Sequence, residues 1–207
     1  MASELKVDTI KHTNNTSAIT LDTSGNITLA GSANNLGTVS AGTIGSNVTF
    51  PAGGTGNPIS VAVIADEKAY NQDGGNSSVG WQDRELNTKI SDPDVIVSIA
   101  SDQFTLGAGT YLIMWSVPGY RTLRHFSLLH DVTAGVDLKV SQTAYNITTG
   151  STQTSSSGSY IHTITSSNTY KIRQYFEDAE TTFGKGVAHD VSGYNSIYTL
   201  VNIYKLK

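Results

Sequence analysis

Residues 104–117 read Phe-Thr-Leu-Gly-Ala-Gly-Thr-Tyr-Leu-Ile-Met-Trp-Ser-Val. Side chains alternate between the two faces of a strand. The stretch therefore predicts a short strand that ends near Leu106 and a longer one in which Tyr111 points inward. Gly107 and Gly109 permit a tight corner between them, because glycine adopts backbone conformations that other residues avoid. We expect two consecutive strands of a β-sheet.

The longer strand is apolar on both faces, and residues 196–204 show the same pattern, with Ile197 expected on the inner face. A strand that is apolar on both faces is covered on both, yet each sheet of a two-sheet sandwich has only one inner face. We expect a neighbouring subunit to cover the second face; a long loop of the same chain is the alternative. The residues predicted to lie in this subunit interface are Leu112, Met114, Tyr198, Leu200 and Tyr204.

The C-terminal part contains further apolar runs separated by Asp, Pro, Gly, Ser and Asn residues that favour turns, and it shows no convincing helix pattern. The predicted strands are 61–65, 81–90, 95–100, 110–117, 123–131, 136–144, 159–165, 169–177 and 196–204. The Ser- and Thr-rich segment 148–158 is predicted to be a long mobile loop. The fold class is therefore predicted to be all-β, an antiparallel β-sandwich or jelly roll.

The N-terminal part carries almost no charge, since Asp22 is the single formal charge between residues 12 and 65. Ser, Thr, Gly and Asn make up 30 of the 49 residues from 12 to 60. Such a segment cannot bury enough apolar surface alone to offset the entropy of ordering it. Hydrophobic-Thr-hydrophobic triplets predict very short strands at residues 19–21, 27–29 and 48–50. They favour an extended β stalk of three chains; a disordered linker is the alternative.

Composition excludes several classes of function. The net charge of −4 argues against binding to nucleic acid or to an anionic membrane, because no basic surface is available. The chain has no cysteine, which rules out disulfides and Cys-based zinc sites. No apolar run is long enough to predict membrane insertion, and the first residues lack the apolar core of a signal peptide.

A glycosidase needs two carboxylates about 5–10 Å apart. Asp83 and Glu85 would share one face of a strand, but Arg84 and Lys89 are close in sequence, and exposed charges on strands usually serve to solvate an edge. The other acidic candidates are Asp66 with Glu67, Asp92 with Asp94, and Glu177 with Asp178 and Glu180. None forms a recognisable catalytic motif, so we predict that the protein is not an enzyme and has no catalytic residue.

Metal binding is only weakly indicated. His125 and His130 are an odd number of residues apart, so they point to opposite faces of one strand and cannot chelate together. The segment 92–94, Asp-Pro-Asp, forms a turn readily without calcium. We predict no metal site and no cofactor.

Several segments of this chain carry a family resemblance. They are Trp-Gln-Asp-Arg-Glu-Leu-Asn-Thr at 81–88, Phe-Thr-Leu-Gly-Ala-Gly-Thr-Tyr at 104–111, Pro-Gly-Tyr-Arg at 118–121, Phe-Gly-Lys-Gly-Val-Ala at 183–188, and residues 198–206. Together they resemble the C1q/TNF-like jelly-roll domains in fibre proteins of tailed phages, particularly marine ones. Residues 3–10 are similar to the start of many phage structural proteins. The resemblance implies a homotrimer with the C-terminal domain as a knob.

On this resemblance we expect a trimeric structural protein on the surface of a tailed-phage virion, assembled in the cytoplasm of the bacterial host. It would be a short tail fibre or a head fibre whose knob attaches to a host surface glycan or protein. The alternatives are a capsid decoration protein and a polysaccharide depolymerase. The sequence names no host-contact residue.

The expected organisation has three segments. Residues 1–11 are predicted to attach the fibre to capsid or tail proteins of the virion. The apolar residues of this attachment segment are Leu5, Val7 and Ile10. Residues 12–59 are expected to form the stalk and a Gly/Pro-rich hinge, and residues 60–207 the jelly-roll knob.

Overall fold

The computed structural model describes residues 9–11, 17–21, 23, 27–29 and 59–206. The chain divides into two compact units, Met1–Thr49 and Phe50–Lys207.

The described residues of the N-terminal unit form a small antiparallel sheet in the order β1-β2-β3. Its strands are β1 (Thr9–Lys11), β2 (Ser17–Leu21) and β3 (Ile27–Leu29). The first two triplets are therefore strands, and the register places Ile19 opposite both Ile10 and Leu29. The third triplet, together with Leu5 and Val7, lies outside the described residues.

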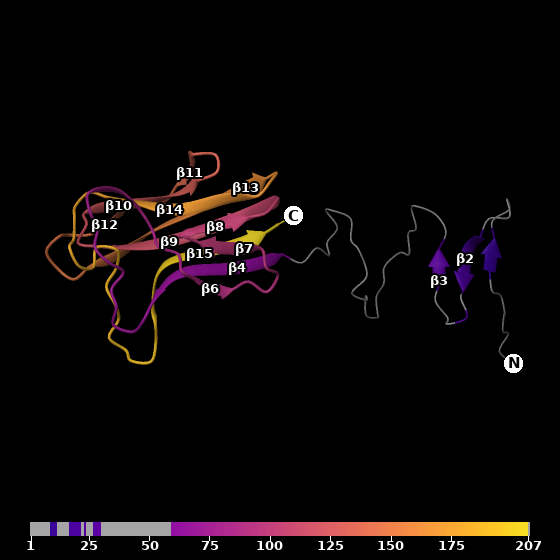
Figure 1. The fold of residues 1–207 in the computed structure, drawn as a ribbon, viewed down its shortest axis with the longest axis horizontal. Helices are drawn as coiled ribbons and strands as arrows, with labels where there is room; N and C mark the ends of the chain where they lie inside the picture. The colour runs from indigo at the N-terminus through magenta and orange to yellow at the C-terminus, as the bar shows by residue number, and fades with distance from the viewer. Residues whose placement is uncertain (1–8, 12–16, 22, 24–26, 30–58, 207) are drawn as a thin grey trace. The chain divides into compact units, whose positions relative to one another are not determined.

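Residues 59–206 form two antiparallel sheets (Figure 1). The five-stranded sheet has the order β13 (Gln153–Ile164), β9 (Gly109–Tyr120), β15 (Ser196–Lys205), β4 (Ser60–Lys68) and β6 (Thr88–Ser91). The seven-stranded sheet has the order β11 (Val136–Val140), β10 (Arg124–Asp131), β14 (Asn168–Phe176), β8 (Gln103–Leu106) and β7 (Val97–Ala100), with β12 (Ala144–Tyr145) paired to β10 and β5 (Gly80–Asp83) paired to β14. The predicted all-β antiparallel sandwich is confirmed.

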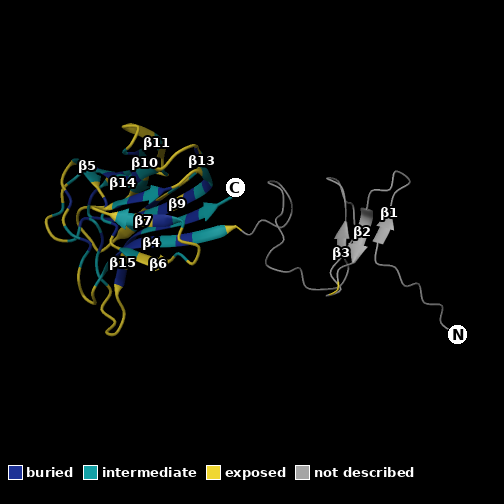
Figure 2. Cartoon of the chain, turned by 45° about the vertical axis from the view of Figure 1, so that its right-hand side comes forward, coloured by how far each residue is buried: buried dark blue, intermediate teal, exposed yellow. Residues whose placement is uncertain are grey.

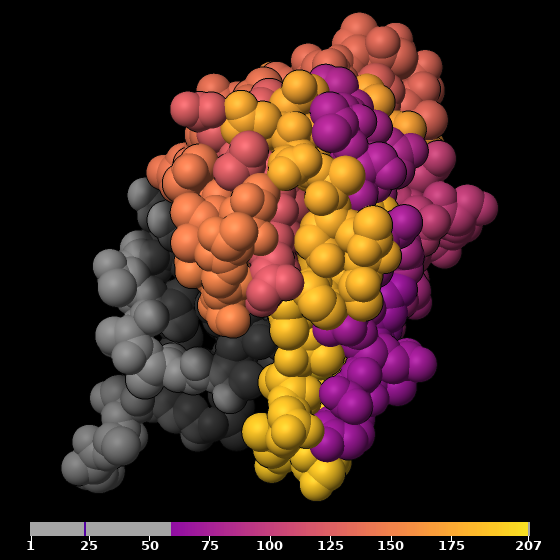
Figure 3. All heavy atoms as spheres, turned by 90° about the vertical axis from the view of Figure 1, so that its left-hand side faces the viewer, coloured from indigo at the N-terminus to yellow at the C-terminus, as the bar shows by residue number. Residues whose placement is uncertain are grey.

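The two ends of this sandwich differ. Ser60 at the start of β4 pairs with Lys205 at the end of β15, so the chain enters and leaves the sandwich at one end. Longer loops gather at the opposite end (Figure 1). There the loop 69–79 and the loop before β15 lie side by side (Figure 3), joined by hydrogen bonds such as Gly74 N to the Gly186 carbonyl at 2.9 Å.

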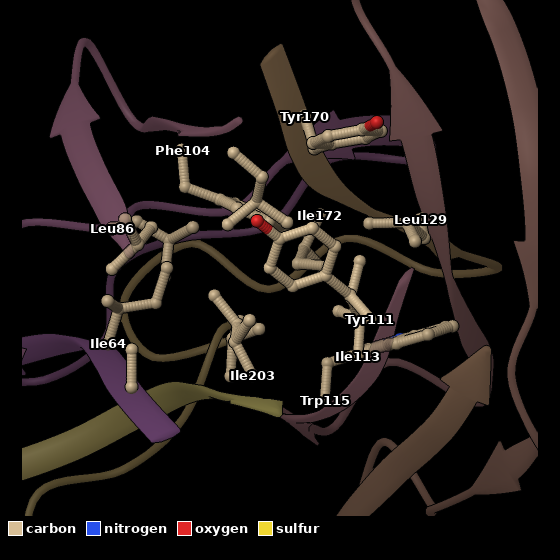
Figure 4. Packing of buried hydrophobic residues seen from close by; sticks show 14 of the residues in the cluster. Ile64, Leu86, Phe104, Tyr111, Ile113, Trp115, Leu129, Tyr170, Ile172 and Ile203 are labelled. Carbon is tan, nitrogen blue, oxygen red and sulfur yellow. The ribbon is translucent and has the colours of Figure 1, made fainter. Parts of the chain in front are cut away.

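The core follows from the alternation along β9. Tyr111, Ile113, Trp115 and Val117 are each at most 2% exposed and face the other sheet. The opposing residues include Phe104, Leu129, Tyr170 and Ile172 (Figure 4). Burial is concentrated along the strands, whereas the loops are largely exposed (Figure 2).

The predicted strand 81–90 is wrong as a single strand. β5 ends at Asp83 in the seven-stranded sheet, and β6 begins at Thr88 in the five-stranded sheet. Residues 84–87 therefore pass from one sheet to the other, and this passage buries the side chains of Arg84 and Leu86. The predicted strand 136–144 is likewise divided, into β11 and β12.

The predicted loop 148–158 is wrong for its second half, because β13 begins at Gln153. The strand alternates, but with serines: Ser155 and Ser157 are exposed, and Ser156 is buried. The Ser156 hydroxyl is satisfied by the hydroxyl of Ser127 at 2.8 Å. Hydrogen-bonded serine takes the place of an apolar residue inside, so the usual apolar alternation is missing from the sequence.

The corner between β8 and β9 uses one of its two glycines. Gly109 has a φ of 153°, whereas Gly107 has no positive φ, and a Cβ added there would meet nothing within 4 Å. The corner therefore requires glycine at position 109, whereas the backbone at Gly107 does not require it.

Candidate functional site

The outer face of the five-stranded sheet carries rows of side chains without a formal charge. Even-numbered residues in the first part of β9 point away from the core, since the odd-numbered ones are buried. Strand pairing extends each of these positions across four strands. The rows are Ile161, Leu112, Tyr204 and Val61; then Ser159, Met114, Asn202 and Val63; then Ser157, Ser116, Leu200 and Ala65. We call this set of residues the uncharged face.

The uncharged face is open around its apolar residues. Ile161 is 60% exposed and Met114 is 41% exposed, while Leu112, Leu200 and Tyr204 are half-buried. Cores of protein interfaces are depleted of charge and rich in large apolar and aromatic side chains. An exposed sheet face, in contrast, normally alternates apolar-in with polar-out. The uncharged face has the chemistry of a surface that another polypeptide covers.

Four of the residues predicted for a subunit interface meet on this face, namely Leu112, Met114, Leu200 and Tyr204. The alternative cover, a long loop of the same chain, is not found over Met114 within the described residues, because this side chain remains exposed.

Tyr198 does not lie on the uncharged face, so the predicted orientation of this residue is wrong. The pairing of β15 with β4 changes register between Ile197 and Leu200, so the side chains before this point face the opposite way from the expected alternation. Tyr198 is only 5% exposed and its hydroxyl donates to the Gln72 carbonyl at 2.6 Å. Ile197, expected inside, is 49% exposed. Tyr198 thus holds the loop 69–79 against the sandwich.

A pocket borders the uncharged face beside β13, the outermost strand of its sheet. It has a volume of about 390 Å³ and is lined by Met114, residues 139–142 and residues 157–159. Met114 therefore borders a recess that is lined mostly by polar residues, including Lys139, and a side chain of a second polypeptide can enter it.

The carboxylates weighed as catalytic pairs take part in ion pairs. Lys68 contacts Asp66 at 3.4 Å and also contacts Glu85, while Lys171 contacts Asp83 at 2.8 Å. Asp66 is 1% exposed, and burial raises its pKa. Asp83 and Glu85 do not share a strand, since β5 ends at Asp83. The predicted geometry of that pair is therefore absent.

Two of the remaining acidic candidates, Asp92 and Glu177, support local structure. Asp92 caps its turn: Oδ1 accepts from the Ile96 amide at 2.8 Å, and Oδ2 accepts from Lys89 Nζ at 3.1 Å. Glu177 forms an ion pair with Arg124 at 2.8 Å. The carboxylates of Asp92 and Glu177 are thus occupied by partners from their own chain.

The histidines that the structure describes do not gather into a metal site. His130 faces outward with its Nδ1 2.6 Å from Asp137 Oδ1, whereas His125 on the same strand is buried, as their spacing predicts. His12 lies outside the described residues. Across residues 59–206 and the short N-terminal strands, no group of three or more His, Cys, Asp or Glu is placed to hold a metal ion. The same residues include no helix long and apolar enough to cross a membrane.

No protein-family model and no curated protein sequence matches the chain. Solved structures do match. The structure of Eiger TNF from S. frugiperda has 11% sequence identity and a TM-score of 0.50, and the match covers 73% of this chain and 94% of that one. Residues 59–206 form a C1q/TNF-like jelly roll. The globular domain of zebrafish complement 1qA has 16% identity and a TM-score of 0.42, covering 73% of this chain and 98% of that one. Murine APRIL has 11% identity and a TM-score of 0.49, covering 72% of this chain and 100% of that one.

Inside the jelly roll, a polar network that the sequence did not indicate joins the two sheets. Arg84 is 0% exposed, and its guanidinium donates to Thr199 Oγ1 at 3.1 Å, Gln174 Oε1 at 3.2 Å and the Lys185 carbonyl at 3.0 Å. Gln174 Nε2 lies 2.9 Å from His125 Nδ1. Burial lowers the pKa of Arg84 to about 10 and that of His125 to about 4. The network ties the passage between sheets to strands of both layers of the jelly roll.

Proposed function

We propose that this protein is a homotrimeric, non-enzymatic fibre on the surface of a tailed-phage virion, and that its jelly roll is a knob for attachment to the host cell. The observation that carries the proposal is the uncharged face, which leaves Met114 and Ile161 in water on a single chain. Contiguous apolar surface of this kind marks an interaction site. Packing three copies together through these faces removes it from water.

The energetic case rests on apolar burial. A stable interface removes about 800 Å² of surface from each partner, and apolar burial contributes about 25 cal/mol per Å². The uncharged face carries no charged side chain, so its burial adds no cost of desolvating a charge to offset the free energy gained from apolar burial. The pocket beside Met114 adds a recess for a side chain of the neighbouring copy.

The phage assignment is supported by the resemblance of residues 3–10 and of the knob segments to phage fibre proteins. Residues 1–11 attach the fibre to capsid or tail proteins, residues 12–59 form the stalk of three chains and its hinge, and residues 60–207 form the knob. Three weak sites on each trimer, repeated over many fibres, convert weak contacts with a host glycan or protein into durable attachment through effective concentration. This mechanism needs no catalytic residue.

The proposal is tested by adding fluorescently labelled full-length protein to host bacteria. Wild-type protein is expected to bind, whereas Met114→Asp, which places a charge in the middle row of the uncharged face, is expected to bind at least about 100-fold more weakly because trivalent contact is lost. Val136→Asp is the matched control, since Val136 is 47% exposed but lies on β11 of the other sheet. Equal binding of Met114→Asp and wild type would contradict the proposal.

The same assay separates other roles. If the wild-type protein does not bind host cells and virions without it are less stable, the protein is a capsid decoration protein rather than an adhesin. Release of reducing sugars from host polysaccharide would replace it with depolymerase activity.

A further inference from the structure

The outer face of the seven-stranded sheet has a different chemistry from the uncharged face. Trp81 on β5, Tyr175 on β14 and Phe126 on β10 form one row across three strands. The next row contains Asp83 opposite Arg173. We call these five residues the aromatic patch.

The aromatic patch is held rigidly. Phe126 and Tyr175 stack with ring centroids 5.4 Å apart and an interplanar angle of 27°. Trp81 meets both at near right angles, with centroid distances of 5.2 Å and 5.6 Å. Edge-to-face packing of this kind is favourable beyond the area it buries. Trp81 nevertheless remains 37% exposed, so a rigid indole is presented to solvent.

Charged side chains of both signs border this indole. The Arg173 guanidinium lies 5.5 Å from the Trp81 ring centroid. Asp83 Oδ1 lies 3.3 Å from Arg173 Nε in an ion pair, and Asp83 Oδ2 accepts a hydrogen bond from Lys171 Nζ at 2.8 Å. The Asp83 side chain is still 49% exposed, so its oxygens retain capacity to accept hydrogen bonds.

A protein partner fits this surface poorly, because covering it would take several charges out of water. A pyranose sugar fits it well. One face of such a ring presents only C–H groups to an aromatic side chain, while the hydroxyls around its rim both donate and accept. We propose that the aromatic patch binds a pyranose unit of a surface glycan, with Trp81 as the stacking platform and Asp83 and Arg173 as partners for its hydroxyls.

This inference rests on the proposed function in one respect: a trimer that packs through the uncharged face leaves the seven-stranded sheet exposed. The host molecule bound is then a glycan, and it binds on the outward, seven-stranded sheet. Each trimer then presents three copies of the aromatic patch, which suits a repetitive polysaccharide.

The chain offers an internal probe. Its two tryptophans are Trp81 and Trp115. Trp115 is 2% exposed, and its indole nitrogen donates to Ser127 Oγ at 2.9 Å. A change in tryptophan fluorescence on adding a ligand therefore reports on Trp81. The probes are tetra- to hexasaccharides of glucose, galactose and uronic acids, and a single-stranded oligonucleotide, each added to the full-length protein.

At least one saccharide is expected to shift the fluorescence saturably at millimolar concentration and to show saturation transfer in NMR. Trp81→Ala is expected to weaken the NMR-detected binding at least about tenfold, and Asp83→Asn several-fold. Trp81→Phe keeps an aromatic ring and is expected to retain part of the affinity. Tyr194→Ala is the control, because Tyr194 is 68% exposed and lies on a loop away from the aromatic patch.

The inference is overturned if no saccharide perturbs Trp81, if Trp81→Ala binds as wild type does, or if only the oligonucleotide binds. Its failure is distinguishable from failure of the proposed function, because the mass of each variant in solution is measured alongside. If a monomeric protein binds the sugar, the glycan site at the aromatic patch is supported and the proposed trimer is contradicted.

Discussion

Gln174 Nε2 lies 2.9 Å from Nδ1 of His125 inside the jelly roll. Gln174 Oε1 accepts a hydrogen bond from Arg84, so the amide nitrogen faces the imidazole and Nδ1 is the acceptor. The ring proton therefore sits on Nε2, which donates to Thr154 Oγ1 at 2.9 Å. In a charged imidazolium, the Nδ1–H of His125 would point at the N–H of the Gln174 amide. If the Gln174 amide rotated, its N–H would instead point at the guanidinium of Arg84. The network fixes His125 in its neutral form.

The first prediction is a loss of stability in mild acid. Burial lowers the pKa of His125 to about 4 from its ordinary value of 6.5. Between these values the unfolded chain binds more protons at this residue than the folded chain, so the free energy of unfolding falls as the pH drops from 6.5 towards 4. The full effect of this residue is about 3 kcal/mol. Urea unfolding of wild type and His125→Gln across this range measures it.

His125→Gln is expected to lose less stability on acidification than wild type does. An unchanged pH dependence in His125→Gln would show that the buried imidazole is not the sensitive group.

The second prediction concerns Arg84. Replacing Arg84 by Lys removes the fork of donors that serves Gln174, Thr199 and the Lys185 carbonyl together, and an ammonium cannot reach all three. Leaving buried acceptors unpaired costs about 1–3 kcal/mol each, so a loss of about 2–4 kcal/mol in the free energy of unfolding is expected. Denaturant midpoints check it, with Arg124→Lys as an exposed control expected to change by less than about 1 kcal/mol. Equal midpoints for the two variants would argue against a structural role of the network.

The third prediction tests the close approach of β13 to β9. A Cβ added at Gly158 would overlap the Trp115 indole. Gly158→Ala is therefore expected to destabilise the fold by about 1–3 kcal/mol through overpacking. Gly107→Ala is the matched control, since its Cβ would meet nothing within 4 Å, and its stability should stay within about 1 kcal/mol of wild type. If the thermal midpoints of the two variants coincide, the packing described for Trp115 is wrong.

The sequence predicts the jelly roll well where burial is apolar. β9 alternates with large apolar residues on its inner face, and its outward residues Leu112 and Met114 mark the uncharged face. β13 is less visible, because Ser156 is buried through hydrogen bonds that composition does not show. The alternation of buried and exposed residues changes at Ile197 because of a β-bulge. A bulge depends on pairing with another strand rather than on local sequence.

The other features that the sequence does not predict depend on contacts between distant residues. Arg84 and Gln174 are buried polar residues that hydrogen-bond to each other. No local sequence pattern predicts a contact between residues 90 positions apart. The same holds for the aromatic patch: Trp81 and Phe126 meet only when β14 lies between their strands. Strand order is a property of the whole chain, whereas alternation is a property of each strand.

Whether the protein is a trimer is decided by the mass of the full-length protein in solution, measured by light scattering at micromolar concentration. Wild type and Val136→Asp are expected to have three times the mass of one chain, and Met114→Asp the mass of a single folded chain. A wild-type protein that is folded and has the mass of one chain would contradict the trimer, because the uncharged face would then be stable in water without a partner.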